Sequence, residues 1–90
     1  MIKLQLSGDF DEMYRELVIE NPDLKEIVWR KIKLLINNPQ DTRLYNHALR
    51  GKMEGQWAFS INSDIRIVYE WLGKNTVRFL AIGGHKIVYN

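Results

Sequence analysis

The 90-residue chain has no cysteine and only two histidines and two prolines. Without cysteine, it can form neither disulfide bonds nor thiolate metal sites, and cysteine redox chemistry is excluded. No apolar run approaches the roughly 20 residues of a membrane span, and the first residues lack the basic start and apolar stretch of a signal peptide. We therefore expect a cytoplasmic protein with one domain, residues 1–90, since so short a chain cannot divide into two cores.

Metal ligands are equally scarce, because no carboxylate cluster stands at metal-binding spacing beside the two histidines. A metal-independent mechanism without cofactors is therefore expected. The net charge of +2 is unevenly distributed. Residues 1–45 hold 7 basic and 8 acidic side chains, whereas residues 46–90 hold 6 basic and 3 acidic ones. This asymmetry weakly favours a polyanionic partner such as nucleic acid.

The first half reads as one strand and two helices. Alternating apolar residues predict a strand at 2–6. Asp9 followed by Glu12 resembles a capping box, which predicts a helix from about residue 10 to 20. Asn21 and Pro22 are typical of a second helix start, and its apolar stripe ends at residues 37–39.

The second half reads as three β-rich strands. They span 56–61, 65–72 and 76–82 and are separated by short turns, so neighbouring strands are antiparallel. The order is β-α-α-β-β-β, in which the first strand must join the later meander. The predicted fold is α+β, an antiparallel-dominated sheet with a helical hairpin packed on one face.

Both histidines lie in the second half, in a pattern that brings three chemical groups together. His47 stands in a polar loop, Arg66 in a strand, and His85 follows Gly83 and Gly84. Imidazole exchanges protons near neutral pH, and a guanidinium matches two phosphate oxygens. This trio suits attack on a phosphodiester without a metal.

The ordered set of motifs resembles the RelE/ParE superfamily of bacterial toxins, specifically the ribonuclease branch with the RelE, YoeB and YafQ types. The resemblance spans nearly the whole chain. It is carried by the element order, the loop 47–51, the strand 64–69 and the terminal 83–85. The chain departs from the family at Ala48, usually Pro, and at Ser60, where the YafQ type has another histidine.

The resemblance implies residue roles at matching positions. The position of His47 supplies a catalytic acid or base, and His47, Arg66 and His85 match the base, cation and acid of a reaction in which a ribose 2′-OH attacks the adjacent phosphorus. Asp64 would orient a histidine or stabilise its protonated form, and Tyr89 matches an aromatic position near the substrate base. Which histidine is the base stays open.

Three basic residues flank the expected site and could contact phosphates: Arg50, Lys52 and Lys86. The resemblance further implies a type II toxin that cleaves mRNA in the ribosomal A site and forms a hetero-oligomer with a cognate antitoxin. Two alternatives remain: a ParE-like toxin that inhibits DNA gyrase, and an inactive antitoxin-binding module.

Each site residue also has a purely structural interpretation. Arg66 could form an ion pair with Glu70 or Asp64 on the sheet surface. Asp64 suits a turn, the glycines suit a strand end, and the basic residues could be solvated charges. The alternating aromatic residues of the strands are assigned to the core rather than to base stacking.

Overall fold

The elements follow the predicted α+β order with one addition. The computed structural model describes residues 1–84 and residue 87. Its helices are α1 (Gly8–Glu20) and α2 (Leu24–Asn37), and its strands are β1 (Lys3–Leu6), β2 (His47–Ala48), β3 (Trp57–Ser60), β4 (Arg66–Trp71) and β5 (Thr76–Gly83). Two short 3₁₀ turns, η1 (Thr42–Leu44) and η2 (Gly51–Met53), flank β2. The two-residue strand β2 was not predicted, because the sequence was interpreted there as a polar loop.

The strands form one sheet in the order β1-β5-β4-β3-β2. β1 pairs parallel to β5, and the other three pairings are antiparallel. The first strand thus joins the meander, as the sequence predicted, and it does so beside β5. The register of β4 against β5 shifts between Val68 and Tyr69: they pair with Ala81 and Phe79, so Leu80 of β5 is the extra residue, as in a β-bulge. Such bulges bend a strand and increase its twist.

The helix boundaries differ slightly from the prediction. Ser7, not Asp9, caps α1: its backbone is extended, and its hydroxyl accepts a hydrogen bond from Phe10 N at 3.0 Å. Serine is a preferred cap because its short side chain reaches a free N–H of the first turn. α2 begins at Leu24, after a turn in which Leu24 N donates to Asn21 O at 3.0 Å. It ends at Asn37 as expected.

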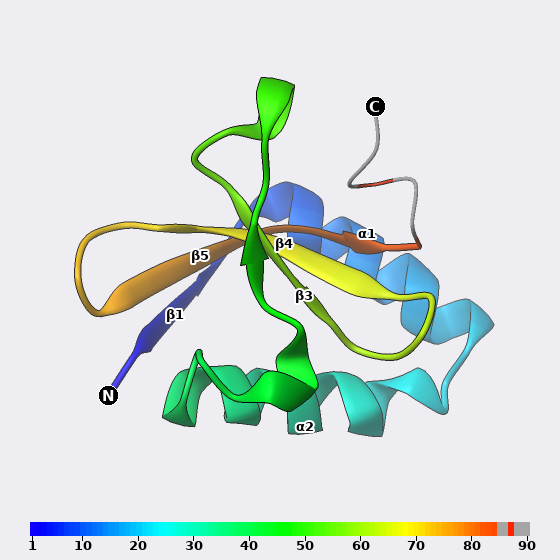
Figure 1. Ribbon diagram of the computed structural model, residues 1–90. Helices are drawn as coiled ribbons and strands as arrows, with labels where there is room; N and C mark the ends of the chain where they lie inside the picture. Colours follow the sequence, from blue (N-terminus) through cyan, green and yellow to red (C-terminus); the bar gives the residue numbers. More distant parts are fainter. Residues whose placement is uncertain (85–86, 88–90) are drawn as a thin grey trace.

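Both helices pack on the same face of the sheet (Figure 1). One core cluster joins residues of both helices to the inward residues of β3, β4 and β5, including Phe10, Val28, Ile32, Phe59, Tyr69 and Phe79. Phe59, Tyr69 and Phe79 meet pairwise with ring centroids 5.7 to 6.2 Å apart. The assignment of the strand aromatic residues to the core is confirmed. The opposite face of the sheet is not covered by the two helices.

Among the helices of residues 1–84, none combines the length and the apolar character that a membrane crossing requires.

Candidate functional site

The face of the sheet opposite the helices carries the polar residues that the sequence singled out. Side chains of directly paired residues share a face, so the pairing of Ser60 with Arg66, and of Arg66 with Gly83, places them in one row. His47 pairs with Ala58, one row away on the same face. A strand spacing of about 4.8 Å and a rise of about 3.3 Å per residue put the Cα atoms of His47 and Arg66 roughly 12 Å apart. Side chains of this length can approach one phosphate from two sides.

A cavity of about 550 Å³ lies where β2 ends beside β3. β2 pairs only with Ala58 and Trp57, so Ser60 has no strand partner on that side. The cavity is lined by residues of α2, η1 and its following turn, β2, β3, the β3–β4 turn and β4: Lys31, Arg43, Tyr45, His47, Ser60, Ile61, Asn62, Ser63 and Arg66. Four of these residues are basic or imidazole side chains and none is a carboxylate, so the lining favours an anion.

His47 is exposed, and one ring nitrogen has a fixed partner. Its Nδ1 lies 2.9 Å from the carbonyl oxygen of Tyr45. A carbonyl oxygen only accepts hydrogen bonds, so Nδ1 carries the proton and the neutral ring keeps its lone pair on Nε2. Tyr45 has a left-handed backbone, with φ of 50°. For a residue other than glycine this conformation costs on the order of 1 kcal/mol, and here it accompanies the carbonyl contact that sets the tautomer of His47.

Arg66 is half-buried and has a neutral partner. Its Nη1 donates to the Ser60 hydroxyl at 3.2 Å. Among the described residues no carboxylate lies within ion-pair distance of Arg66. The predicted alternative, an ion pair with Glu70 or Asp64, is therefore absent in this part of the chain. The guanidinium keeps its charge available to a ligand in the cavity.

A buried hydroxyl fixes the loop that precedes His47. The Tyr69 hydroxyl donates to Asn46 Oδ1 at 2.8 Å, and Asn46 Nδ2 donates to the Pro39 carbonyl at 3.0 Å. Burial raises the pKa of Tyr69, so the phenol stays neutral and remains a donor. Asn46, which directly precedes His47, is thereby hydrogen-bonded both to β4 and to the loop that follows α2.

Two basic residues on the cavity wall differ in their partners. Arg43 donates from Nε to Asp41 Oδ1 at 3.0 Å and from Nη2 to Oδ2 at 2.7 Å. The Arg43 hydrogen bonds lower the pKa of Asp41 to about 2. Lys31 is half-buried, and within residues 1–84 and 87 its Nζ donates one hydrogen bond, to the Arg43 carbonyl at a long 3.4 Å. The Arg43 side chain is thus held by Asp41 at η1, whereas Lys31 lines the cavity without a carboxylate partner among the described residues.

Asp64 stands in the β3–β4 turn, exposed and outside the cavity lining. Asn62 Oδ1 accepts hydrogen bonds from the backbone N–H groups of Asp64 and Ile65 at 2.8 and 2.7 Å, which fixes the turn. Asp64 lies beside Gly84: a Cβ built on Gly84 would be 3.4 Å from Asp64 Oδ1. The structure thus supports the turn interpretation of Asp64 and places its carboxylate against the chain that leads to position 85.

The remaining predicted site residues are not brought to the cavity or are not described. Arg50 precedes η2 and Lys52 lies within it, both exposed on the projecting hairpin between β2 and β3 and outside the lining. His85, Lys86 and Tyr89 lie outside the described residues. Sequence reasoning missed Lys31, Tyr45 and Ser60 as lining residues. Two signals were available: Lys31 interrupts the apolar stripe of α2, and Ser60 stands where the YafQ type has a histidine.

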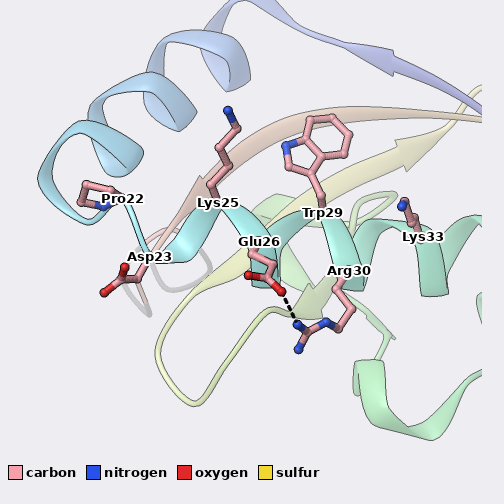
Figure 2. Close-up of a pocket in the computed structure, with 7 residues that line it drawn as sticks. All are labelled: Pro22, Asp23, Lys25, Glu26, Trp29, Arg30 and Lys33. Atoms are coloured by element: carbon pink, nitrogen blue, oxygen red, sulfur yellow. Dashed lines mark hydrogen bonds and ion pairs between the residues drawn. The ribbon is translucent and has the colours of Figure 1, made fainter.

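A second hollow, of about 800 Å³, lies on the outer face of α2 (Figure 2). Its side chains include Lys25, Trp29 and Lys33, and Arg30 Nη2 is paired with Glu26 Oε1 at 2.9 Å. Trp29 Nε1 donates to the Tyr14 hydroxyl at 2.8 Å, which joins the two helices. This hollow carries charged side chains of both signs.

The described residues offer no metal centre: within 1–84 and 87, no three side chains of His, Cys, Asp or Glu cluster closely enough to hold an ion.

Several solved structures share this fold. A copper-bound mutant toxin from Helicobacter pylori is 26% identical, with a TM-score of 0.80 over 99% of this chain and 100% of its own. A chain of the E. coli DinJ–YafQ toxin–antitoxin complex is 21% identical, with a TM-score of 0.78 over 99% of this chain and 98% of its own. A YoeB/ParE toxin from Agrobacterium tumefaciens is 20% identical, with a TM-score of 0.79 over 93% of this chain and 99% of its own.

No protein-family model matches the sequence, and no curated protein does. The resemblance to the RelE/ParE superfamily is confirmed at the level of the fold: the chain has the fold of the RelE/YafQ-type toxins.

Proposed function

We propose that this protein is the toxin of a type II toxin–antitoxin pair and that it cleaves RNA at the cavity lined by His47 and Arg66. The single observation that carries the proposal is that His47, with a free ring nitrogen, and Arg66, which no carboxylate of the described residues pairs, line one cavity. The fold supports the toxin assignment, because toxins from three bacteria share it. A cognate antitoxin is the proposed partner by the same comparison, since one of these structures is a toxin–antitoxin complex.

The proposed reaction is attack of a ribose 2′-OH on the adjacent phosphorus. His47 Nε2 takes the hydroxyl proton because Nδ1 is already protonated against Tyr45. The 2′-oxygen forms a bond to phosphorus while the bond to the 5′-oxygen breaks. The departing 5′-oxygen takes a proton from a general acid, a role we assign to His85 on its sequence position. The products are a 2′,3′-cyclic phosphate and a 5′-hydroxyl.

Arg66 stabilises the charge that develops on the phosphorane oxygens. Its planar fork can donate two hydrogen bonds to those oxygens, which a lysine ammonium matches poorly. Ser60 holds one arm of the fork by the 3.2 Å hydrogen bond and so restricts the orientation of the guanidinium. A preorganised donor of this kind contributes roughly 10²- to 10³-fold to a rate.

Inducible expression tests the proposal. Wild type, Arg66→Ala and His47→Ala are expressed while growth is followed and transcript 5′ ends are mapped. The proposal predicts that wild type arrests growth with new mRNA cuts and that both variants, folded by circular dichroism, lose the cuts. Cuts confined to translated frames would support action on the ribosome in the cytoplasm.

Growth arrest without cuts would contradict the ribonuclease and favour a ParE-like toxin that acts on DNA gyrase. The absence of any arrest would favour an inactive antitoxin-binding module. Recovery of growth on co-expression of a small protein encoded beside the toxin would identify the antitoxin.

A further inference from the structure

Lys31 is the one half-buried lysine on the wall of the cavity. It lies on α2, whose apolar stripe packs against the sheet, while its neighbours Arg30 and Lys33 are exposed on the outer surface. The ammonium therefore reaches past the edge of the core to the junction of α2 with η1. There it lines the same cavity as His47 and Arg66.

Within the part of the chain that the structure describes, Lys31 uses one of its three hydrogen-bond donors. An ammonium has three N–H donors, and Lys31 makes one long bond of 3.4 Å to the Arg43 carbonyl. The nearby Asp41 carboxylate is held by two hydrogen bonds from the Arg43 side chain. Among the described residues no carboxylate lies within ion-pair distance of Lys31. A half-buried cation without a paired anion is a suitable binding group for a phosphate.

The cavity is also larger than one phosphate group requires. Its volume of about 550 Å³ falls in the range of roughly 300 to 1,000 Å³ that holds drug-sized ligands. Tyr45 stands on its wall and is 74% exposed, with a left-handed backbone. An exposed aromatic ring beside a cationic groove is the usual arrangement for stacking a base of a single strand.

We propose that Lys31 binds the backbone phosphate next to the one attacked at Arg66, and that Tyr45 stacks on the base of that neighbouring nucleotide. The substrate class is single-stranded RNA that extends past the cut, since a base-paired strand does not present a free base to Tyr45. This assignment rests on the proposed function and adds a second subsite to it.

The test compares RNA ligands that contain or lack the neighbouring phosphate. A dinucleotide with the mapped cut sequence has only the scissile phosphate, whereas a pentanucleotide has flanking ones. Both carry deoxyribose at the cut, so neither is cleaved, and binding is measured by fluorescence anisotropy. Lys31→Gln should weaken pentanucleotide binding about tenfold, as expected for one charged hydrogen bond, and leave dinucleotide binding unchanged.

Salt dependence gives an independent readout. The slope of log K against log salt for the pentanucleotide should fall by about 0.7 in Lys31→Gln, the value for one lost phosphate contact on a single strand. Lys33→Gln is the matched control: it removes the same charge from the same helix, on the exposed side. Lys33→Gln should leave the affinity for both RNA ligands unchanged. Lys31→Arg keeps the positive charge and should bind the pentanucleotide nearly as tightly as wild type does.

Tyr45→Asn tests the stacking, because asparagine tolerates the left-handed backbone. Tyr45→Asn should weaken binding of the pentanucleotide and leave binding of the dinucleotide unchanged. Tyr45→Phe keeps the ring and should bind both RNAs as wild type does. The subsite would be overturned if Lys31→Gln lost the same affinity for both RNAs, or if Lys33→Gln weakened pentanucleotide binding as much as Lys31→Gln. Either result would leave the proposed function intact. If wild type binds neither RNA, and Arg66→Ala makes no difference, the proposed function itself fails and the subsite with it.

Discussion

Tyr69→Phe isolates the contribution of one hydroxyl to the position of His47. The change removes a single oxygen from a fully buried ring and breaks the 2.8 Å hydrogen bond to Asn46 Oδ1. A hydrogen bond of this kind contributes about 0.5–1.5 kcal/mol net, and Asn46 is half-buried, so water can reach its freed oxygen in part. We expect a loss of about 1 kcal/mol, which lowers the melting temperature by roughly 4–8 °C in a domain of this size.

The effect on catalysis should exceed the effect on stability. Asn46 precedes His47 directly, and β2 is only two residues long, so few other contacts hold the histidine in place. A misplacement of about 1 Å can cost up to roughly 100-fold in rate, and we expect kcat to fall about tenfold at saturating RNA. Thermal unfolding by circular dichroism and cleavage of a fluorescent oligonucleotide measure the two effects.

Tyr14→Phe is the matched control. It removes the same atom from a half-buried tyrosine that does not line the cavity and whose hydroxyl accepts a hydrogen bond from Trp29 Nε1 at 2.8 Å. It should leave kcat unchanged. A double-mutant cycle of Tyr69→Phe with Asn46→Ala should give a coupling energy of about 0.5–1.5 kcal/mol. If the two changes are additive, or if Tyr14→Phe lowers kcat equally, the positioning argument is refuted.

Three further predictions concern charge, backbone and pH. Arg66→Lys should lower kcat/KM about 10²- to 10³-fold in a cleavage assay, because the ammonium lacks the planar fork, while thermal stability is unchanged. Gly73→Ala should lose at least about 1 kcal/mol in urea unfolding because its φ is 115°, whereas Gly8→Ala, without positive φ, should not lose stability. Because burial raises the pKa of Tyr69, stability should be intact below pH 10 and decline as the pH rises above it, less so in Tyr69→Phe.

Each of these predictions has a clear contrary result. Full activity of Arg66→Lys would mean that a point charge suffices in place of the fork. If Gly73→Ala and Gly8→Ala were equally stable, a side chain at position 73 would not strain the β4–β5 turn. Identical alkaline unfolding of wild type and Tyr69→Phe would mean that another group controls stability above pH 10.

The strands were predictable because local patterns determine them. Alternation at 57–61 and 65–71 predicted β3 and β4, and the turns between them predicted antiparallel pairing, which in turn placed Arg66 on the free face of the sheet. The start of α1 was misplaced, because both Ser7 and Asp9 are good caps and only the extended backbone at Ser7 decides between them.

The walls of the cavity were not predictable from local patterns. Lys31 and Tyr45 reach it through tertiary packing: α2 lies beside η1, and the left-handed turn at Tyr45 has no glycine to indicate it. Arg50 and Lys52 illustrate the opposite error. They are near His47 in the sequence, but the segment between β2 and β3 projects from the sheet (Figure 1), and neither residue lines the cavity.

The chemistry of the cut ends tests the central claim most directly. Purified protein is incubated with an RNA oligonucleotide, and with the same strand carrying deoxyribose at the cut, in buffer with a metal chelator. The account predicts a 2′,3′-cyclic phosphate and a 5′-hydroxyl by mass spectrometry, no cleavage of the deoxy strand, and no cleavage of either by Arg66→Ala. Cleavage of the deoxy strand, or a 5′-phosphate product, would contradict attack by the 2′-OH and with it the roles of His47 and Arg66.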